Sequence, residues 1–305
     1  MTGTNTKATK GRLRIGRINF TNTWPVSYYQ PYARDDAGVD WISEVPTGGN
    51  RAMAEGRIDI APISSFAYAE RAEDYLILPD LSVSAYGKVN SILLYHKVPL
   101  NQLDRARIAL PTTSATSVNL LKIILKKFYQ FEPHYFYEEP DLDKMLLTAD
   151  AALLIGDDAI RASWEDHRQL QVTDLGEWWL KLTGKWMTFA LWVVRKEAAE
   201  QLPELLEHVY HAFCMSKKHN LAHPEAMVKD ACEKIGGDAE YWHYYFSNLC
   251  YDFGKEQQEG LALYYQYARE CGFLDKEVTI RLWDRAKYKA PGEGIQATTN
   301  VRVSR

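Results

Sequence analysis

The sequence predicts an α/β protein made of two lobes, and three observations lead to this prediction. Short apolar stretches alternate with helical patterns over most of the chain, and polar turns join them. Two long apolar strands that end in cations, 92–97 and 188–196, bound a block with its own strands and helices. After Lys196 only helical patterns remain. An inserted block between two crossing strands makes a two-lobed clamp with a cleft between the lobes.

The composition is that of an ordinary soluble globular protein. The chain has 305 residues, of which 46% are hydrophobic and 25% charged, so it is long enough for two domains. A net charge of −4 gives no reason to expect nucleic acid or an anionic membrane as a partner. Residues 1–11 lack the apolar segment of a signal peptide, so we expect a cytoplasmic protein.

The first lobe begins with three strand–turn–helix units. Their strands are expected at 13–18, 41–45 and 58–63. Pro25 suits the first turn of a helix, with Thr23 as its cap, and Ser64 and Ser65 begin the helix after the third strand. Regular repetition of this unit favours a parallel, doubly wound sheet. Asn22 then lies at the carboxyl end of the first strand, where ligands of such sheets gather.

The pattern also predicts the division of the chain. The inserted block has strands expected at 107–110, 134–137, 151–155 and 171–175, and helices at 114–129, 141–148, 156–164 and 176–183. We predict a discontinuous first lobe (12–94 and 190–286), a second lobe (95–189) and flexible tails (1–11 and 287–305). The C-terminal helices are expected to pack on the first lobe.

One turn of the second lobe is rich in hydroxyl groups. Residues 112–117 follow a buried strand and precede a helix, and their candidate ligand-binding residues are Thr113, Ser114, Thr116 and Ser117. The first turn of a helix has N–H groups without partners and a partial positive charge, so it suits an anion. A Ser or Thr cap with nothing bound is the alternative, although capping explains one hydroxyl well and not five.

Other polar turns follow strands in the same way. They contain the candidate ligand-binding residues Ser64, Ser65, Ser84, Asn90, Ser91 and Gly156, together with Asp157. Each alone is typical of a cap or turn, but in a clamp all would converge on the cleft. Asp157 follows a buried strand, and its carboxyl group there could hydrogen-bond a hydroxyl group, or protonate one if its pKa is raised.

No motif for a metal, a cofactor or a covalent nucleophile is present. His208 and His211, like His219 and His223, have a spacing that can share a metal, but they lie in a charged, Lys-rich helical surface. The sequence has no nucleophile elbow, phosphate-binding loop or dinucleotide fingerprint. The residues therefore predict a cleft for a small polar anion, and they leave a binding protein and an enzyme both open.

Several segments resemble the menaquinone-biosynthesis family that contains chorismate dehydratase. These segments are 14–25, 59–68, 76–84, 116–121, 153–157, 174–179 and 182–184. They occur in order over roughly residues 12 to 275. The resemblance implies a type II periplasmic-binding-protein-like fold used as an enzyme, with no cofactor and no metal.

The resemblance also implies a reaction and roles for the polar turns. The family removes water from chorismate to give 3-[(1-carboxyvinyl)oxy]benzoate, in the futalosine route to menaquinone. Residues 113–117 would bind one carboxylate, and Ser64, Ser65, Asn90 and Ser91 would bind the other. Asn22 would orient the substrate or a water molecule, and Asp157 would contact the ring hydroxyl group as its acid.

Some alternatives stay open within this resemblance. Some members have Arg where Ala115 stands, so backbone N–H groups or Lys88 would balance that carboxylate here. The base is either a protein group or a substrate carboxylate. The rival functions are the sister enzyme that forms 1,4-dihydroxy-6-naphthoate and a non-catalytic small-anion-binding protein. We expect chorismate as the small-molecule partner, neither nucleic acid nor membrane, and a monomer or homodimer.

Overall fold

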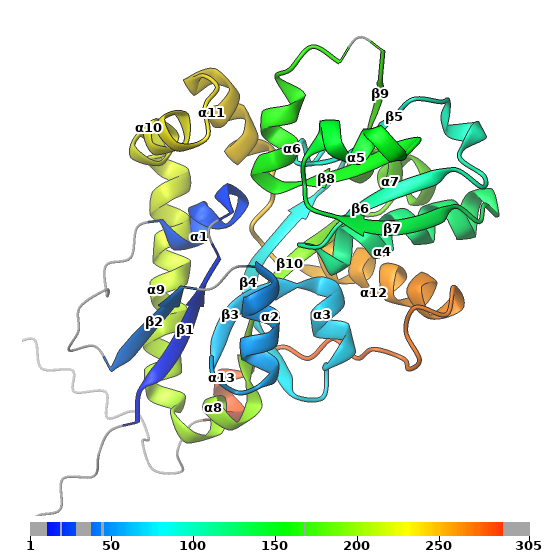
Figure 1. Ribbon diagram of the computed structural model, residues 1–305. Coiled ribbons are helices and arrows are strands. Elements are labelled where there is room, and N and C mark those ends of the chain that lie inside the picture. Colours follow the sequence, from blue (N-terminus) through cyan, green and yellow to red (C-terminus); the bar gives the residue numbers. More distant parts are fainter. Residues whose placement is uncertain (1–10, 19, 29–37, 44–45, 168, 289–305) are drawn as a thin grey trace, which may run out of the picture.

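The computed structural model describes residues 11–18, 20–28, 38–43, 46–167 and 169–288, and it has two lobes (Figure 1). Each lobe is built on one five-stranded sheet. The two-lobed α/β architecture predicted from the sequence is therefore confirmed. The predicted tails, 1–11 and 287–305, fall outside the described residues except at their innermost positions.

The first sheet is mixed rather than all parallel. Its strands, in spatial order, are β2 (Val39–Ser43), β1 (Leu13–Arg17), β3 (Ile60–Ser64), β10 (Met187–Arg195) and β4 (Tyr75–Ala85). β2, β1 and β3 are parallel, as predicted. β10 is antiparallel to both of its neighbours, because the chain returns from the second lobe and enters the sheet between β3 and β4.

The second sheet is made from one continuous segment. Its strands, in spatial order, are β7 (His134–Glu138), β6 (Arg107–Pro111), β8 (Ala151–Ile155), β5 (Ile92–His96) and β9 (Gln171–Asp174). All of β5 pairs within this sheet, and all of β10 pairs within the first. The chain therefore crosses between the sheets at 86–91 and 175–186, ahead of the boundaries predicted after residues 94 and 189.

The helices of the two lobes follow the predicted turns. The first lobe has η1 (Thr21–Thr23), α1 (Trp24–Ser27), α2 (Pro46–Ala54), α3 (Ser65–Glu70) and α8 (Lys196–Gln201). The second has η2 (Leu100–Gln102), α4 (Ala115–Ile123), its π-helical continuation η3 (Ile124–Tyr129), α5 (Leu142–Thr148), α6 (Gly156–Ser163) and α7 (Leu175–Thr183). One predicted cap is corrected. Thr23 precedes α1 without capping it, because its hydroxyl group donates to the carbonyl oxygens of Ile18 and Phe20.

The C-terminal helices pack on the first lobe, and two of them also contact the second. They are α9 (Pro203–Ala222), α10 (Glu225–Lys234), α11 (Ala239–Asn248), α12 (Lys255–Glu270) and α13 (Arg285–Tyr288). α9 packs on α1 and β4, whereas α12 lies against both β10 and α4 (Figure 1). α11 contacts the second lobe through the rings of Tyr241 and Trp164.

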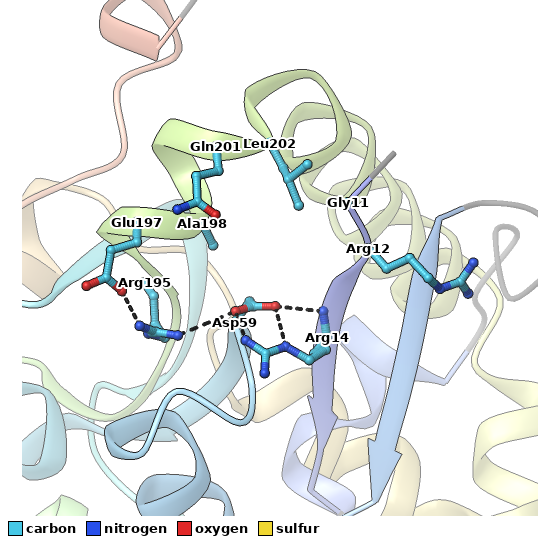
Figure 2. A pocket seen from close by; sticks show the side chains of 9 residues that line it. All are labelled: Gly11, Arg12, Arg14, Asp59, Arg195, Glu197, Ala198, Gln201 and Leu202. Atoms are coloured by element: carbon cyan, nitrogen blue, oxygen red, sulfur yellow. Dashed lines mark hydrogen bonds and ion pairs between the residues drawn. The ribbon is translucent and has the colours of Figure 1, made fainter. Parts of the chain in front are cut away.

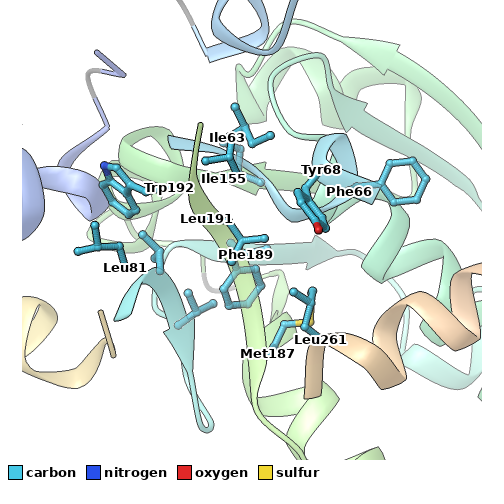
Figure 3. Packing of buried hydrophobic residues seen from close by; sticks show 14 of the residues in the cluster. Ile63, Phe66, Tyr68, Leu81, Ile155, Met187, Phe189, Leu191, Trp192 and Leu261 are labelled. Atoms are coloured by element: carbon cyan, nitrogen blue, oxygen red, sulfur yellow. The ribbon is translucent and has the colours of Figure 1, made fainter. Parts of the chain in front are cut away.

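One hydrophobic core is continuous through both lobes. It joins Ile63 and Leu191 of the first sheet to Ile155 of the second and to Leu261 of α12 (Figure 3). Full burial of such a side chain contributes roughly 1.5–3 kcal/mol to folding. Because this apolar surface is shared, each lobe stabilises the other.

Candidate functional site

The candidate site lies where the two lobes touch. Two direct contacts across this boundary define what we call the inter-lobe junction. Its residues are Phe20, Thr21 and Phe66 of the first lobe and Thr116, Gly156 and Asp157 of the second. All of them follow the carboxyl ends of strands, or begin the helix after such a strand, as the sequence predicted for ligand-binding turns.

The first contact joins Thr21 and Asp157. Thr21 donates to Asp157 Oδ1 through its hydroxyl group, at 2.5 Å, and through its backbone N–H, at 3.3 Å. Thr21 follows β1, and Asp157 lies in the first turn of α6 after β8. The two residues are 136 positions apart in the sequence. The site therefore depends on how the lobes are placed relative to one another.

Gly156 allows this approach. Its φ of +61° is in the left-handed region, and a Cβ atom there would lie 2.8 Å from the ring of Phe20. Its N–H donates to the carbonyl oxygen of Ser91 at 2.7 Å. A glycine is therefore needed both for the backbone conformation and for the contact between the lobes.

The second contact joins the first turns of α3 and α4. The backbone N–H of Phe66 donates to Thr116 Oγ1 at 2.9 Å. Phe66 follows Ser64 and Ser65 directly, and Thr116 lies within the hydroxyl-rich turn of the second lobe. The structure thus brings together two of the turns that the sequence predicts to hold carboxylates.

Burial shifts the pKa of the Asp157 carboxyl group upward. The residue is only 8% exposed, and this burial raises its pKa above the ordinary value of 3.8. The hydrogen bonds from Thr21 oppose this shift, and so does the more distant charge of Arg161. The hydrogen bonds from Thr21 involve only Asp157 Oδ1, and no described residue donates a hydrogen bond to Oδ2. Asp157 thus has a pKa shifted upward and an Oδ2 atom that accepts from no described residue, and its role as a general acid stays a prediction.

The hydroxyl-rich turn is used partly for capping. Ser114 caps α4 by accepting from the N–H of Ser117 at 3.3 Å, and the two hydroxyl groups are 3.0 Å apart. The hydroxyl oxygen of Thr116 already accepts from the N–H of Phe66, and Thr113 is half-buried. Thr113, Ser114, Thr116 and Ser117 are thus held near the junction, and their role in binding an anion stays a prediction.

Three other predicted hydroxyl groups have partners inside the first lobe. Ser64 caps α3 by accepting from the N–H of Ala67 at 3.2 Å. Ser65 donates to the carbonyl oxygen of Thr188 at 2.8 Å. Ser84 lies 2.9 Å from the hydroxyl group of Thr188 and 2.8 Å from that of Ser82. Ser65 and Ser84 are buried, so both attach the returning strand β10 to its neighbours.

A carboxylate that the sequence analysis did not single out holds the turn with Asn90 and Ser91. Asp174 caps α7 and also accepts from the backbone N–H groups of Val89 and Asn90, at 3.1 and 2.7 Å. The side-chain nitrogen of Asn90 is buried and has no hydrogen-bond partner among the described residues. A buried amide donor without a partner is costly, so Asn90 is a strong candidate for contact with a ligand.

Asn22 lies beside the first contact of the junction. It is the middle residue of η1, directly after Thr21, and it is half-buried. Its side chain makes no hydrogen bond to any residue that the structure describes. The structure therefore places Asn22, Gly156, Asp157 and Ser91 in one group and Ser64, Ser65 and Thr116 in another.

Three buried tyrosine hydroxyl groups of the C-terminal helices are not among the site residues predicted from the sequence. Tyr245 donates to Ser91 Oγ at 2.9 Å, Tyr264 to the carbonyl oxygen of Thr116 at 3.1 Å, and Tyr265 to that of Ser65 at 2.7 Å. Each acceptor belongs to a predicted site residue. The available signal was the use of Tyr, rather than Phe, on apolar helix faces.

A second polar cluster lies at the opposite end of the first sheet, beside a cavity of about 400 Å³ (Figure 2). Asp59 accepts from the backbone N–H and the guanidinium group of Arg14 at 2.6–3.0 Å, and it lies 3.7 Å from Arg195. Arg195 also pairs with Glu197. Because these charges neutralise one another, we interpret the cluster as structural. It joins the ends of β1, β3 and β10.

Within the described ranges, no three His, Cys, Asp or Glu side chains gather as metal ligands would. None of the described helices is both long and apolar enough to cross a membrane.

The family follows from the sequence as a whole. Residues 13–270 match the family model described as menaquinone biosynthesis. The chain belongs to this family. It is 30% identical to chorismate dehydratase from Thermus thermophilus over 264 residues, which is 82% of this chain and 93% of the relative. It is 28% identical to 1,4-dihydroxy-6-naphthoate synthase from the same organism over 268 residues, which is 85% and 95% of the two chains.

Solved structures show the fold of this family member. Protein AF1704 from Archaeoglobus fulgidus superposes with a TM-score of 0.70 at 18% identity, over 88% of this chain and all of the other. The periplasmic aliphatic sulphonate binding protein from Escherichia coli gives 0.64 at 17% identity, over 96% and 97%. The predicted periplasmic-binding-protein-like fold is therefore confirmed.

Proposed function

We propose that this menaquinone-biosynthesis protein is a chorismate dehydratase, a hydro-lyase that converts chorismate to 3-[(1-carboxyvinyl)oxy]benzoate and water. The main support in the structure is Asp157, a buried carboxyl group with a raised pKa that Thr21 holds across the lobes. The 30% identity to a chorismate dehydratase, over 93% of that protein, adds support from the sequence.

The reaction needs little from the protein beyond orientation and proton transfer. Chorismate is a dianion that carries a ring hydroxyl group. A base removes the proton from the ring carbon that bears the enolpyruvyl ether, and that electron pair forms a new ring double bond. The bond between the neighbouring ring carbon and its hydroxyl group breaks. The hydroxyl oxygen takes up a proton and leaves as water. Formation of the aromatic ring provides the driving force.

In this proposal Asp157 protonates the leaving hydroxyl group through Oδ2, while Thr21 holds Oδ1. Asn22, next to Thr21, orients the ring or a water molecule at the proton that is removed. The base is either a protein group or a carboxylate of the substrate itself.

The remaining polar turns bind the two carboxylates. The turn at 113–117 binds one of them, and Ser64, Ser65, Asn90 and Ser91 surround the other. The free amide nitrogen of Asn90 is one donor. The others are groups of these turns without an internal partner, because several hydroxyl groups and the N–H groups of Phe66, Ala67 and Ser117 are already used. A hydrogen bond to a charged group contributes about 1.5–3 kcal/mol, so a few such donors are enough for a dianion.

The test is to mix the purified full-length protein with chorismate and to follow both substrate and product by chromatography. We expect conversion to the aromatic ether, and we expect Asp157→Asn to lower the rate by roughly 10²–10⁴ with an unchanged circular dichroism spectrum. Binding of chorismate without consumption would instead indicate a small-anion-binding protein. Formation of 1,4-dihydroxy-6-naphthoate from its own precursor would indicate the sister enzyme.

We further propose that the enzyme acts in the cytoplasm as a monomer or homodimer. On this proposal its partner is the small-molecule substrate, and it binds neither nucleic acid nor membrane and uses no metal or cofactor.

A further inference from the structure

Two adjacent tyrosines of α12 reach different lobes. Tyr265 donates through its hydroxyl group to the carbonyl oxygen of Ser65, the first residue of α3 in the first lobe. Tyr264 donates to the carbonyl oxygen of Thr116, in the first turn of α4 in the second lobe. A single helix therefore holds the beginnings of two helices that belong to different sheets.

A third bond closes this arrangement. The backbone N–H of Phe66, next to Ser65, donates directly to Thr116 Oγ1. α3 and α4 are therefore joined once by direct contact and once through α12. Neither route includes a ligand.

The tyrosine pair is firmly held. Tyr264 and Tyr265 are buried, with ring centroids 5.7 Å apart, and burial raises the pKa of both hydroxyl groups well above 10.0, so both remain donors. α12 is itself fixed at Gly260, where a Cβ atom would lie 2.1 Å from the carbonyl oxygen of Trp186. Trp186 directly precedes β10, so α12 is fixed against a segment on which the chain crosses between the lobes.

We propose that Tyr264 and Tyr265 are positioning residues that set the distance between the turns at 64–66 and 114–117, and thereby select ligands with two anionic groups at a fixed separation. The inference rests on the proposed function, because these are the turns proposed to bind the two carboxylates of chorismate. A ligand with one carboxylate uses one turn and is insensitive to the separation. A rigid dicarboxylate needs both turns at once, so it loses affinity when the separation is free to vary.

The test compares Tyr264→Phe, Tyr265→Phe and the double variant with Tyr267→Phe. Tyr267 lies on the same helix, and its hydroxyl group makes no hydrogen bond to a described residue. We expect the double variant to raise the KM for chorismate about tenfold with little change in kcat, since loss of uniform binding acts on KM. We also expect the inhibition constant of isophthalate to rise about tenfold, and that of benzoate to stay within about twofold. Tyr267→Phe should behave as the unmodified protein.

Two results would overturn the inference. One is a lower kcat with unchanged KM and a matching loss of folded protein, which is what a purely structural role predicts. The other is an equal loss of affinity for benzoate and isophthalate. If the double variant does not fold, the single variants carry the same comparison with smaller effects.

A second measurement does not require turnover. If the unmodified protein leaves chorismate unchanged, the proposed function fails, and hydrogen exchange followed by mass spectrometry still tests the tyrosine pair. We expect the double variant to exchange faster than the unmodified protein in both 64–67 and 114–118. Unchanged exchange in both segments would overturn the positioning role.

Discussion

Two buried aspartates of this protein have similar burial and opposite surroundings. Asp59 is 6% exposed and receives hydrogen bonds from the guanidinium group and backbone of Arg14, with Arg195 as a second cation. Asp157 is 8% exposed and, among the described residues, receives hydrogen bonds only from Thr21. The comparison indicates that burial does not decide what an acid does. The charge of its partners changes how strongly the charged form is disfavoured.

The difference has a simple physical cause. A buried carboxylate between two guanidinium groups joins the strands that carry them. A buried carboxyl group with neutral donors has its charged form disfavoured, so it retains its proton more readily. Departures from full pairing of buried polar groups concentrate at functional sites. The amide nitrogen of Asn90, in the turn with Ser91, is also buried without a partner among the described residues.

After Asp157→Asn, the largest effect expected on turnover comes from Asn22→Ala, beside the junction. If the unpaired groups of the junction serve the reaction, removal of this amide should lower kcat by about 10²–10³, the usual cost of losing one preorganised donor. Steady-state kinetics with chorismate measures the effect. The matched control is Asn101→Ala at an exposed position of η2, which should retain full activity. Full turnover by a folded Asn22→Ala protein would remove Asn22 from the mechanism.

Asp59→Asn tests the opposite side of the comparison. It leaves Arg14 and Arg195 without their shared carboxylate, so we expect a loss of about 3 kcal/mol in the free energy of unfolding, the low end for a buried pair. The low end applies because the Arg14 side chain is 38% exposed. Urea denaturation measures the loss, and the activity of each folded molecule should not change.

The control for this change is Asp40→Asn, which breaks an exposed ion pair with Arg12. It should cost less than about 1 kcal/mol. If Asp59→Asn lowers kcat of the folded protein while its stability stays the same, the cluster at that end of the sheet is not structural.

Gly156→Ala tests whether close approach of the lobes matters. A Cβ atom would meet the ring of Phe20, and the left-handed backbone would be strained, so Asp157 should move away from Thr21. A displacement of about 1 Å in a catalytic group can cost roughly 10² in kcat/KM. Gly184→Ala is a matched control, since its φ is +67° with open space around it, and it should lose stability but not activity.

The smallest effect expected is on the stability of Asp157→Asn. Burial raises the pKa of Asp157 in the folded protein, so the unfolded chain gives up this proton at a lower pH. The folded state is therefore penalised as pH rises from 3.8 to the raised value, and the penalty persists above it. Asparagine removes the penalty and can still accept from Thr21. We expect a higher Tm than the unmodified protein at pH 8 and no difference near pH 3.5.

Local patterns were sufficient to predict most of the fold. Alternating apolar stretches predicted the strands of both sheets, and the polar turns predicted where helices begin. The antiparallel direction of β10 was not predicted, because the residues of one strand do not indicate which distant strand it pairs with. For the same reason no pattern connected Thr21 with Asp157.

The sequence predicted polar turns that the structure brings close together, but not the internal partners of their side chains. A hydroxyl group after a strand is equally suited to a ligand and to an internal partner, and the internal bonds of Ser65 and Ser84 became visible only in the structure. Tyr264 and Tyr265 fit the apolar face of a helix. Hydrophobic periodicity does not indicate which acceptor the hydroxyl group of a buried tyrosine contacts. Gly156 was predicted within the site, and the structure adds the physical reason through its contact with Phe20.

The entry of β10 between β3 and β4 has a consequence for how the chain folds during synthesis. The second sheet uses only residues from Ile92 to Asp174, so all of its strands leave the ribosome before β10 does. The first sheet lacks a strand next to β3 and β4 until residue 195 has emerged. Strand edges that stay unpaired until a later strand is synthesised can pair with other chains. The lobe that begins the sequence is thus the one whose sheet is completed last.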